Sequence, residues 1–147
     1  MKNNHLNLLC CVIAVVLVVG GIAGSLQLME LRAEEPRRAI VAMEMILGKN
    51  YMIPKIFGVN YYNKPPLFNW LLAFTFSIAG SYKELWVRLP SVLSLFITSL
   101  LIYKIVRRYY TRQPAFIAAM LLPVSADILF YGAVDSGELD LFFTLII

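Results

Sequence analysis

The chain opens with a long run that contains no charged residue, and this run restricts it to a membrane. No Asp, Glu, Lys or Arg occurs between Leu6 and Met29. A helix of this length, rising about 1.5 Å per residue, crosses a hydrocarbon core of about 30 Å. The 147 residues are 60% hydrophobic and 15% charged, with a mean hydropathy of +0.73, too apolar for a soluble domain of this size. We therefore predict an all-α, polytopic transmembrane protein whose first span covers about residues 6–29.

A cleaved signal peptide is the alternative interpretation of this first run. Its apolar part exceeds the roughly 7 to 15 residues of a signal sequence, so we favour a retained anchor, and Lys2 favours a cytoplasmic N-terminus. Cys10 and Cys11 are adjacent within the run and are typical of small hydrophobic residues rather than metal ligands. The net charge of +4 comes from basic residues that flank apolar runs, which indicates membrane orientation and argues against nucleic acid as a partner.

Residues 30–88 form a predicted outer loop that holds much of the charge. Pro36 stands where proline often opens a helix. Apolar residues then recur at helical spacing from Ala39 to Leu47. Gly48 follows them, and glycine is common at the end of a helix. This pattern predicts a short amphipathic helix suited to the membrane surface. Residues 51–62 are predicted to be an extended loop.

The apolar segment 67–80 decides the topology of the remainder. As a helix it measures only about 21 Å, so we predict that it is half embedded; the alternative is a full crossing. The half-embedded arrangement gives further spans at about 89–106 and 114–132, and the start of another at 140–147. The loop then lies outside, and the cytoplasm holds the basic cluster of Arg107, Arg108 and Arg112, as the positive-inside rule prefers.

Charged residues converge on the outer side in this topology. Glu34 and Arg37 begin the outer loop, Lys64 precedes two prolines, and residues 136–140 follow the third predicted span. A carboxylate there can act as general base for an acceptor hydroxyl, and arginine and lysine can bind a phosphate. This combination suits transfer of a group away from a lipid-linked phosphate, whose growing charge needs stabilisation. Asp127, an ionisable residue inside a predicted span, is a further candidate.

Each candidate also has a plain structural interpretation. Glu34 with Arg37 or Arg38 makes an i, i+3 or i, i+4 pair that would only support a surface helix. Lys64 would anchor the chain among lipid head groups, and Asp127 would face a neighbouring helix. From spacing alone both interpretations stay open.

The outer loop and its continuation are made of short motifs in a definite order. They are Glu34-Glu35-Pro36-Arg37-Arg38-Ala39, Met43-Glu44-Met45, Ile53-Pro54, Gly58, Tyr61-Tyr62-Asn63-Lys64-Pro65-Pro66-Leu67, Trp70 and Arg88-Leu89-Pro90. Together with the preceding apolar run, this order resembles the N-terminal part of membrane glycosyltransferases of the GT-C fold. It is most similar to the branch of aminoarabinose lipid A transferases and protein O-mannosyltransferases. The resemblance covers essentially the whole chain.

The resemblance implies roles for individual residues. Glu34 matches the first acid of the outer loop, usually Asp, which is the proposed catalytic base of that family. Glu35 matches the second acid, and Arg37 matches the arginine that follows it. Lys64 matches the lysine expected near the donor phosphate. Because Glu is one methylene longer than Asp, the choice between Glu34 and Glu35 as the base stays open.

The resemblance also implies a second acidic site. Asp140, in Leu139-Asp140-Leu141-Phe142, resembles the acid at the outer start of a later span, with Glu138 as the alternative alignment. Asn63 stands where the lipid A branch commonly has Glu before Lys-Pro. A metal ligand proposed at that position therefore does not carry over, and we assign no metal ligand in this chain. The need for a divalent metal stays open.

These implications together predict an inverting glycosyltransferase. It would move a sugar from a polyprenyl-phosphate donor to a lipid, glycan or protein acceptor, and the protein itself would contact membrane lipid. We expect a multi-pass protein of the cell membrane, in bacteria the inner membrane, whose active-site loop faces outside or the periplasm. The chain is expected to be an N-terminal fragment that is inactive alone. The alternatives are a non-enzymatic membrane scaffold and a transporter subunit that handle lipid-linked sugars.

Overall fold

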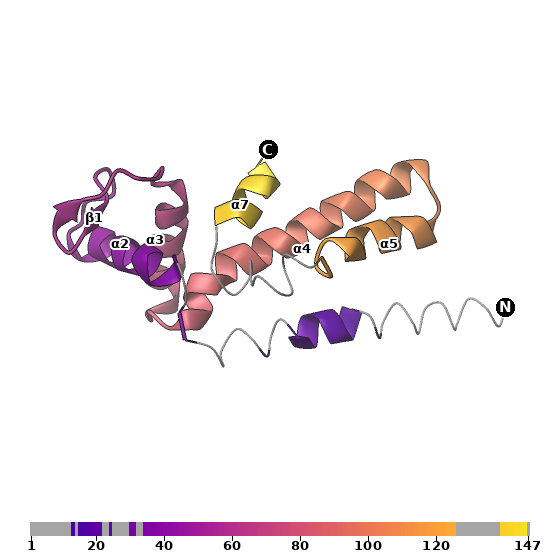
Figure 1. The fold of residues 1–147 in the computed structure, drawn as a ribbon, viewed down its shortest axis with the longest axis horizontal. Helices are drawn as coiled ribbons and strands as arrows, with labels where there is room; N and C mark the ends of the chain where they lie inside the picture. Colours follow the sequence, from indigo (N-terminus) through magenta and orange to yellow (C-terminus); the bar gives the residue numbers. More distant parts are fainter. Residues whose placement is uncertain are drawn as a thin grey trace.

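The computed structural model describes residues 13, 15–21, 24, 30–31, 34–125 and 139–146. They are mostly helical, which confirms the helical part of the predicted class. The elements in chain order are α2 (Glu35–Leu47), β1 (Lys55–Ile56), β2 (Val59–Asn60), α3 (Leu67–Ala79), α4 (Glu84–Tyr109), α5 (Arg112–Leu121) and α7 (Leu139–Ile146). Figure 1 shows α2, β1 and α3 gathered at one end of the long α4, while α5 and α7 lie beside it.

α4 is the long apolar helix of the structure. Its 26 residues extend about 39 Å, and among the described residues it is the one helix long and apolar enough to cross a membrane. It begins at Glu84, earlier than the predicted span 89–106, because an acidic first turn complements the helix dipole. Arg107 and Arg108 occupy the last turn, where positive charge is favourable for the same reason.

Pro90 lies inside α4 and removes one backbone hydrogen bond. In a regular helix the carbonyl of Trp86, four residues earlier, would accept that bond. Thr75 of α3 lies beside this carbonyl: its Oγ1 is 3.3 Å from the Trp86 oxygen and 2.8 Å from the Leu72 oxygen. The hydroxyl therefore fastens α3 to the first turns of α4, at the carbonyl that has lost its intrahelical donor.

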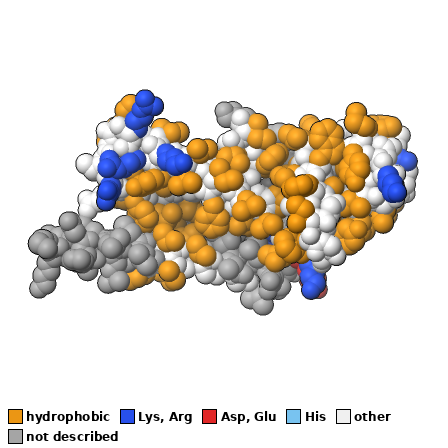
Figure 2. All heavy atoms as spheres, turned by 180° about the vertical axis from the view of Figure 1, so that it is seen from behind, with side chains coloured by type: hydrophobic (Ala, Val, Ile, Leu, Met, Phe, Trp, Pro, Cys, Tyr) orange, Lys and Arg blue, Asp and Glu red, His pale blue; other side chains and the backbone are white. Residues whose placement is uncertain are grey.

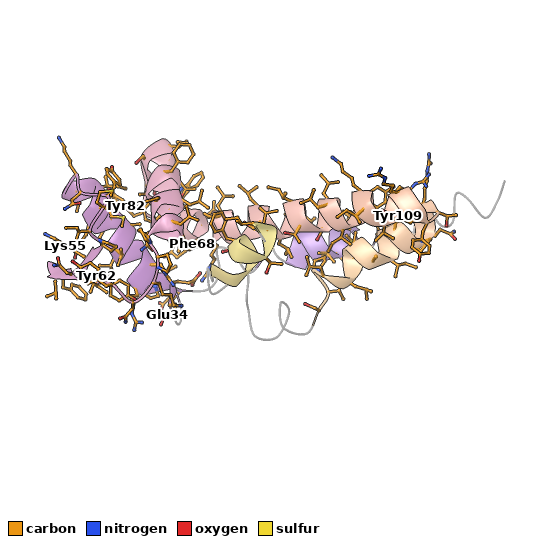
Figure 3. All side chains as sticks on the ribbon, turned by 90° about the horizontal axis from the view of Figure 1, so that it is seen from above. Glu34, Lys55, Tyr62, Phe68, Tyr82 and Tyr109 are labelled. Atoms are coloured by element: carbon orange, nitrogen blue, oxygen red, sulfur yellow. The ribbon has the colours of Figure 1, made fainter. Side chains whose placement is uncertain are left out.

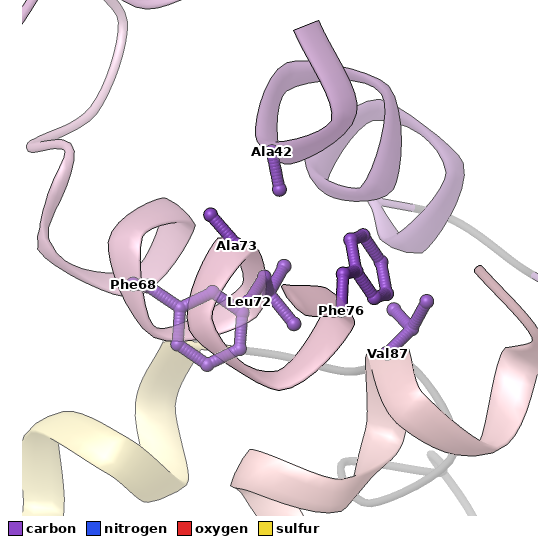
Figure 4. Close-up of a cluster of buried hydrophobic side chains, with 6 residues drawn as sticks. All are labelled: Ala42, Phe68, Leu72, Ala73, Phe76 and Val87. Carbon is purple, nitrogen blue, oxygen red and sulfur yellow. The ribbon is translucent and has the colours of Figure 1, made fainter. Parts of the chain in front are cut away.

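A small hydrophobic core joins α2, α3 and α4. α3 supplies most of it, from positions spaced three or four residues apart, which lie on one side of a helix. Figure 4 shows the six buried side chains, which are Ala42 of α2, Phe68, Leu72, Ala73 and Phe76 of α3, and Val87 of α4. α2 thus turns part of its apolar face towards α3. Contact of α2 with a membrane surface stays a prediction.

α3 agrees with the predicted apolar segment 67–80. Gly80 follows it in the left-handed conformation, at φ 61°, and donates its N–H to the Phe76 carbonyl at 2.9 Å. Figure 1 shows α3 lying across the beginning of α4 rather than alongside it. A half-embedded helix would have this orientation, and its depth in a membrane stays a prediction.

The predicted extended loop 51–62 contains a two-stranded antiparallel hairpin. Lys55 of β1 is opposite Asn60 of β2. Between the strands, Phe57 and Gly58 both have positive φ values, 51° and 78°, as in a type I′ hairpin turn. Glycine adopts this region freely, whereas a phenylalanine there is strained and needs support from its surroundings.

Two hydrogen bonds hold the hairpin and the segment before it against the helices. The N–H of Gly58 donates to the Glu44 carboxylate of α2 at 3.3 Å. The indole N–H of Trp70, in the first turn of α3, donates to the Tyr51 carbonyl at 2.6 Å. The first bond thus holds the hairpin to α2, and the second holds the segment between α2 and the hairpin to α3.

α5 and α7 both pack along α4 (Figure 1). In α5 the buried residues are Ala115 and Ala119, small side chains that allow two helices to approach closely. α5 covers the first half of the predicted span 114–132, and residues 126–132 lie outside the described residues. α7 begins at Leu139, where a helix was predicted, and the Phe142 ring lies 5.9 Å from the ring of Phe68 in α3.

The surface has the charge distribution of a membrane protein. Figure 2 shows hydrophobic side chains over the middle of one face and Lys and Arg side chains at its two ends. Exposed apolar residues of α4, including Leu93, Ile97 and Leu100, recur at helical spacing. An apolar belt between basic ends is typical of a chain that spans a bilayer. The number of spans stays a prediction.

Candidate active site

Glu34 stands at the N-terminus of α2 and carries an accessible carboxylate. Its backbone carbonyl accepts the N–H of Arg38 at 3.0 Å, which fixes it to the first turn. Nη1 of Arg37 donates to both carboxylate oxygens, at 2.8 and 3.0 Å. The side chain of Glu34 is 33% exposed and that of Arg37 is 46% exposed. The carboxylate is thus oriented by an arginine and still open to a substrate.

Glu35, the next residue, has the opposite environment. Its Oε1 accepts Nε of Arg88 at 2.9 Å, and its Oε2 accepts Nη2 of the same guanidinium at 3.0 Å. Both side chains are 0% exposed. Arg88 also donates from Nη2 to the backbone carbonyl of Glu30 at 3.0 Å. This bidentate geometry is the strongest form of an arginine–carboxylate pair.

The partner of Glu35 was not predicted from the sequence. In the sequence, Arg88 is distinguished only as the first residue of the Arg88-Leu89-Pro90 motif. The predicted span began at residue 89 and so left Arg88 outside it. Extending that helix back to Glu84 would have placed a charge in its second turn, where it needs an internal partner. The pattern gave no indication of which acid that partner would be. Arg38, considered above as a surface residue, is also buried, at 2% exposure.

Lys64 stands beside an open hollow of about 360 Å³ at the base of the hairpin. The lining residues are Met52, Pro54, Tyr61, Tyr62, Asn63, Lys64, Pro65 and Pro66. Lys64 and Asn63 are exposed. The two prolines restrict the chain just before α3, and the Pro66 carbonyl accepts the Trp70 N–H at 2.9 Å.

Lys64 gives the lining of this hollow a positive charge, and the sequence around it is basic. Residues 45–83 contain four lysines and no acidic residue. A hollow bordered by lysine and tyrosine side chains can accept an anion together with hydroxyl-bearing groups. Lysine would act on a phosphate as a point charge, without the fixed geometry of arginine.

The structure brings Glu34 and the hollow to the same end of the molecule. Figure 3 shows Glu34 and Tyr62, which lines the hollow, at one end, with Tyr109 of α4 at the opposite end. Arg37 is at the same end through its bond to Glu34. The predicted grouping of Glu34, Arg37 and Lys64 is thus compatible with the fold, and their joint role stays a prediction.

The second acidic site is described only in part. Asp140 is the second residue of α7, which packs beside α4, but its side chain lies outside the description. Glu138 and Asp127 lie outside the described residues altogether. Among the residues that are described, no group of three or more His, Cys, Asp and Glu side chains is placed to hold a metal ion. The roles of Asp140 and Glu138 remain predictions.

Comparison with known proteins agrees with the motif pattern. The family model of dolichyl-phosphate-mannose-protein mannosyltransferase matches residues 63–147. The undecaprenyl phosphate-alpha-4-amino-4-deoxy-L-arabinose arabinosyl transferase 2 of Pseudomonas fluorescens is 33% identical over 112 residues, or 76% of this chain and 19% of the relative. The protein of the same name from Proteus mirabilis is 32% identical over 89 residues, 60% of this chain and 16% of the relative.

These matches define what the chain is similar to. It spans about a fifth of the length of the curated relatives it matches. No solved structure matches it. The family model covers more than half of the chain, including Lys64 and the helices that follow it. The chain therefore belongs to the dolichyl-phosphate-mannose-protein mannosyltransferase family of GT-C membrane glycosyltransferases.

Proposed function

We propose that this chain is the N-terminal part of a glycosyltransferase that moves a sugar from a polyprenyl-phosphate donor to an acceptor at the outer face of a bacterial inner membrane. The observation that carries the proposal is the oriented, accessible carboxylate of Glu34 at the same end of the molecule as the lysine-bordered hollow. The family and the names of the bacterial relatives, which specify an undecaprenyl phosphate-linked aminosugar, support it.

Glu34 is the better candidate for the base. Glu35 has no exposed side-chain surface, and both of its oxygens accept hydrogen bonds from Arg88. Glu35 could reach an acceptor only after that buried pair had separated. Glu34 keeps a third of its side chain exposed while Arg37 orients it. The difference in accessibility therefore supports Glu34 rather than Glu35 as the proposed base.

The proposed reaction is a single displacement with inversion. Glu34 takes the proton of the acceptor hydroxyl as the acceptor oxygen bonds to the anomeric carbon. The bond from that carbon to the phosphate oxygen breaks, and the lipid phosphate leaves with the electron pair. Arg37, which uses Nη1 for Glu34 and has further N–H donors, and Lys64 stabilise the growing charge. Asp140, or Glu138 in its place, would supply a second carboxylate.

Replacement of Glu34 by Gln in the complete transferase tests this assignment. The amide has a similar size but cannot accept the proton, so sugar transfer should fall by roughly 100-fold or more, the usual contribution of a general base. Binding of the donor lipid should change little. Glu84→Gln, an exposed acid in the first turn of α4, is the matched control and should transfer normally. Normal turnover in Glu34→Gln would remove Glu34 as the base.

Thiol labelling of intact cells tests the proposed orientation. Single cysteines at Asn60 and Thr111, in a chain without Cys10 and Cys11, report the two ends of α4. A membrane-impermeant reagent should label position 60 and leave position 111 protected until the membrane is permeabilised. Labelling of both positions from outside would exclude the half-embedded arrangement of α3.

A further inference from the structure

The guanidinium of Arg88 joins two parts of the chain that are far apart in sequence. It lies in the second turn of α4 and bonds Glu35, 53 residues earlier, and the Glu30 carbonyl, 58 residues earlier. Between these contacts lie α2, the hairpin and α3. One side chain therefore closes the entire outer loop at its base, next to the apolar part of α4.

This closure acts on Glu34 through its immediate neighbour. The peptide between Glu34 and Glu35 is rigid, and the Glu34 backbone is helical, with φ −86° and ψ −12°. Its carbonyl is held by the N–H of Arg38. Once Arg88 fixes Glu35, the backbone of Glu34 has a defined position relative to α4. Only side-chain torsions remain, and Arg37 restricts these.

The geometry of the Glu35–Arg88 contact is suited to fixing the orientation of the two groups, and not only to attracting opposite charges. A planar guanidinium that meets both carboxylate oxygens fixes distance and direction together, which an ammonium group cannot do. Buried ion pairs can often be replaced by apolar residues of similar volume with no loss of stability. The pair between Glu35 and Arg88 therefore needs a reason beyond stability, and placement of the neighbouring base supplies one.

We propose that Arg88 is a positioning residue of the transferase, which holds Glu35 and the Glu30 carbonyl so that the Glu34 carboxylate faces the acceptor. The proposal rests on the proposed function of Glu34 as general base. Arg88 itself has no exposed surface, so we expect it to act through Glu35 rather than by touching the substrate. Its loss should lower kcat and leave the KM for the donor lipid nearly unchanged, because the region that lines the hollow beside Lys64 has its own hydrogen bonds to α2 and α3.

Two variants of the complete transferase separate alignment from folding. Arg88→Lys keeps the charge but loses the two-pronged contact, and kcat should fall at least tenfold. The double variant Glu35→Leu with Arg88→Met removes both charges of the pair together, so neither partner is left behind as a buried charge. It should insert and resist protease like the wild type, yet show the same loss of kcat. If the double variant transfers normally, the pair is only structural and the proposal is wrong.

A double-mutant cycle tests whether Arg88 acts through Glu34. In the Glu34→Gln background, adding Arg88→Lys should cause no further loss of residual turnover, since no base remains to be positioned. A further tenfold loss would show that Arg88 acts elsewhere and would overturn the proposal. Arg108→Lys, an exposed change in the same helix, is the control and should have no effect in either background.

The result also distinguishes this proposal from the proposed function. If Glu34→Gln retains wild-type turnover, the base assignment fails, whatever Arg88 does. If Glu34→Gln is inactive but Arg88→Lys keeps wild-type kcat, the base assignment stands and the positioning role fails. A tenfold loss in Arg88→Lys together with an inactive Glu34→Gln supports both.

Discussion

Two adjacent glutamates of this chain meet arginines in opposite surroundings. Glu34 pairs with Arg37, three residues along the same helix, and both side chains are exposed to a third or more of their surface. Glu35 pairs with Arg88, 53 residues away, and both side chains are fully buried. The sequence shows the two acids as nearly equivalent, whereas the structure gives one of them access to substrate and the other a fixed place in the interior.

The comparison shows how two neighbouring residues in one turn of helix can have separate roles, one carboxylate reacting and the other fixing the backbone. A buried carboxylate fully occupied by a guanidinium cannot exchange protons with a substrate without breaking its contacts. An exposed carboxylate on a loosely held segment would have no defined position. Glu34 and Glu35 together combine an accessible carboxylate with a fixed backbone. This requires that the buried Glu35–Arg88 pair is stronger than the exposed Glu34–Arg37 pair, as their burial indicates.

The largest effect on stability should follow from removing one partner of the buried Glu35–Arg88 pair. Arg88→Ala leaves the Glu35 carboxylate buried without its partner, and the free energy of unfolding should fall by about 3–5 kcal/mol. Denaturant titration in mixed micelles, followed by the fluorescence of Trp70 and Trp86, measures it. The control is Arg108→Ala on the exposed surface of the same helix. A loss equal to that of the control would mean that the Glu35–Arg88 pair is not buried in solution.

A smaller effect on stability should follow from removing a hydrogen bond at the start of α4, the part of the helix that carries Arg88. Thr75→Val preserves the shape of the side chain but removes the hydroxyl beside the Trp86 carbonyl, which Pro90 leaves without an intrahelical donor. Because a partly buried carbonyl then loses a partner, the free energy of unfolding should fall by about 1 kcal/mol. Ser77→Ala is the matched control, since its hydroxyl bonds an Ala73 carbonyl within the same helix. Equal losses in both variants would contradict the special role of Thr75.

The elements were predictable where the pattern is local. The apolar segment 67–80 gave α3 almost to the residue, and the uncharged stretch after Leu89 gave the body of α4, because length and composition decide such helices. The start of α4 was placed too late. The prediction from the apolar pattern gave too little weight to the acidic first turn at Glu84. It also gave too little weight to the tolerance of a helix for a proline near its start, here Pro90.

The contacts between distant segments were not predictable in this way. The hairpin turn uses Phe57 before Gly58, whereas sequence rules expect Asn or Asp there, so no turn signal distinguished it from a loop. The pairing of Glu35 with Arg88 depends on α2 and α3 packing together and closing the chain onto α4. Residue spacing cannot encode such a contact. The candidate base, by contrast, came from a motif that is contiguous in the chain.

The smallest effect on stability should come from the exposed pair. Arg37→Ala should lower the free energy of unfolding by no more than about 1 kcal/mol, because solvent screens the charges and two mobile side chains are released. At about 1 M salt, where the screening length is near 3 Å, even this difference should vanish, while the loss in Arg88→Ala should persist. Sugar transfer by Arg37→Ala should nevertheless fall, since Arg37 orients the base. Stability lost to the same extent in Arg37→Ala and Arg88→Ala would remove the distinction between the two pairs, and with it the reason to assign the base to Glu34 rather than Glu35.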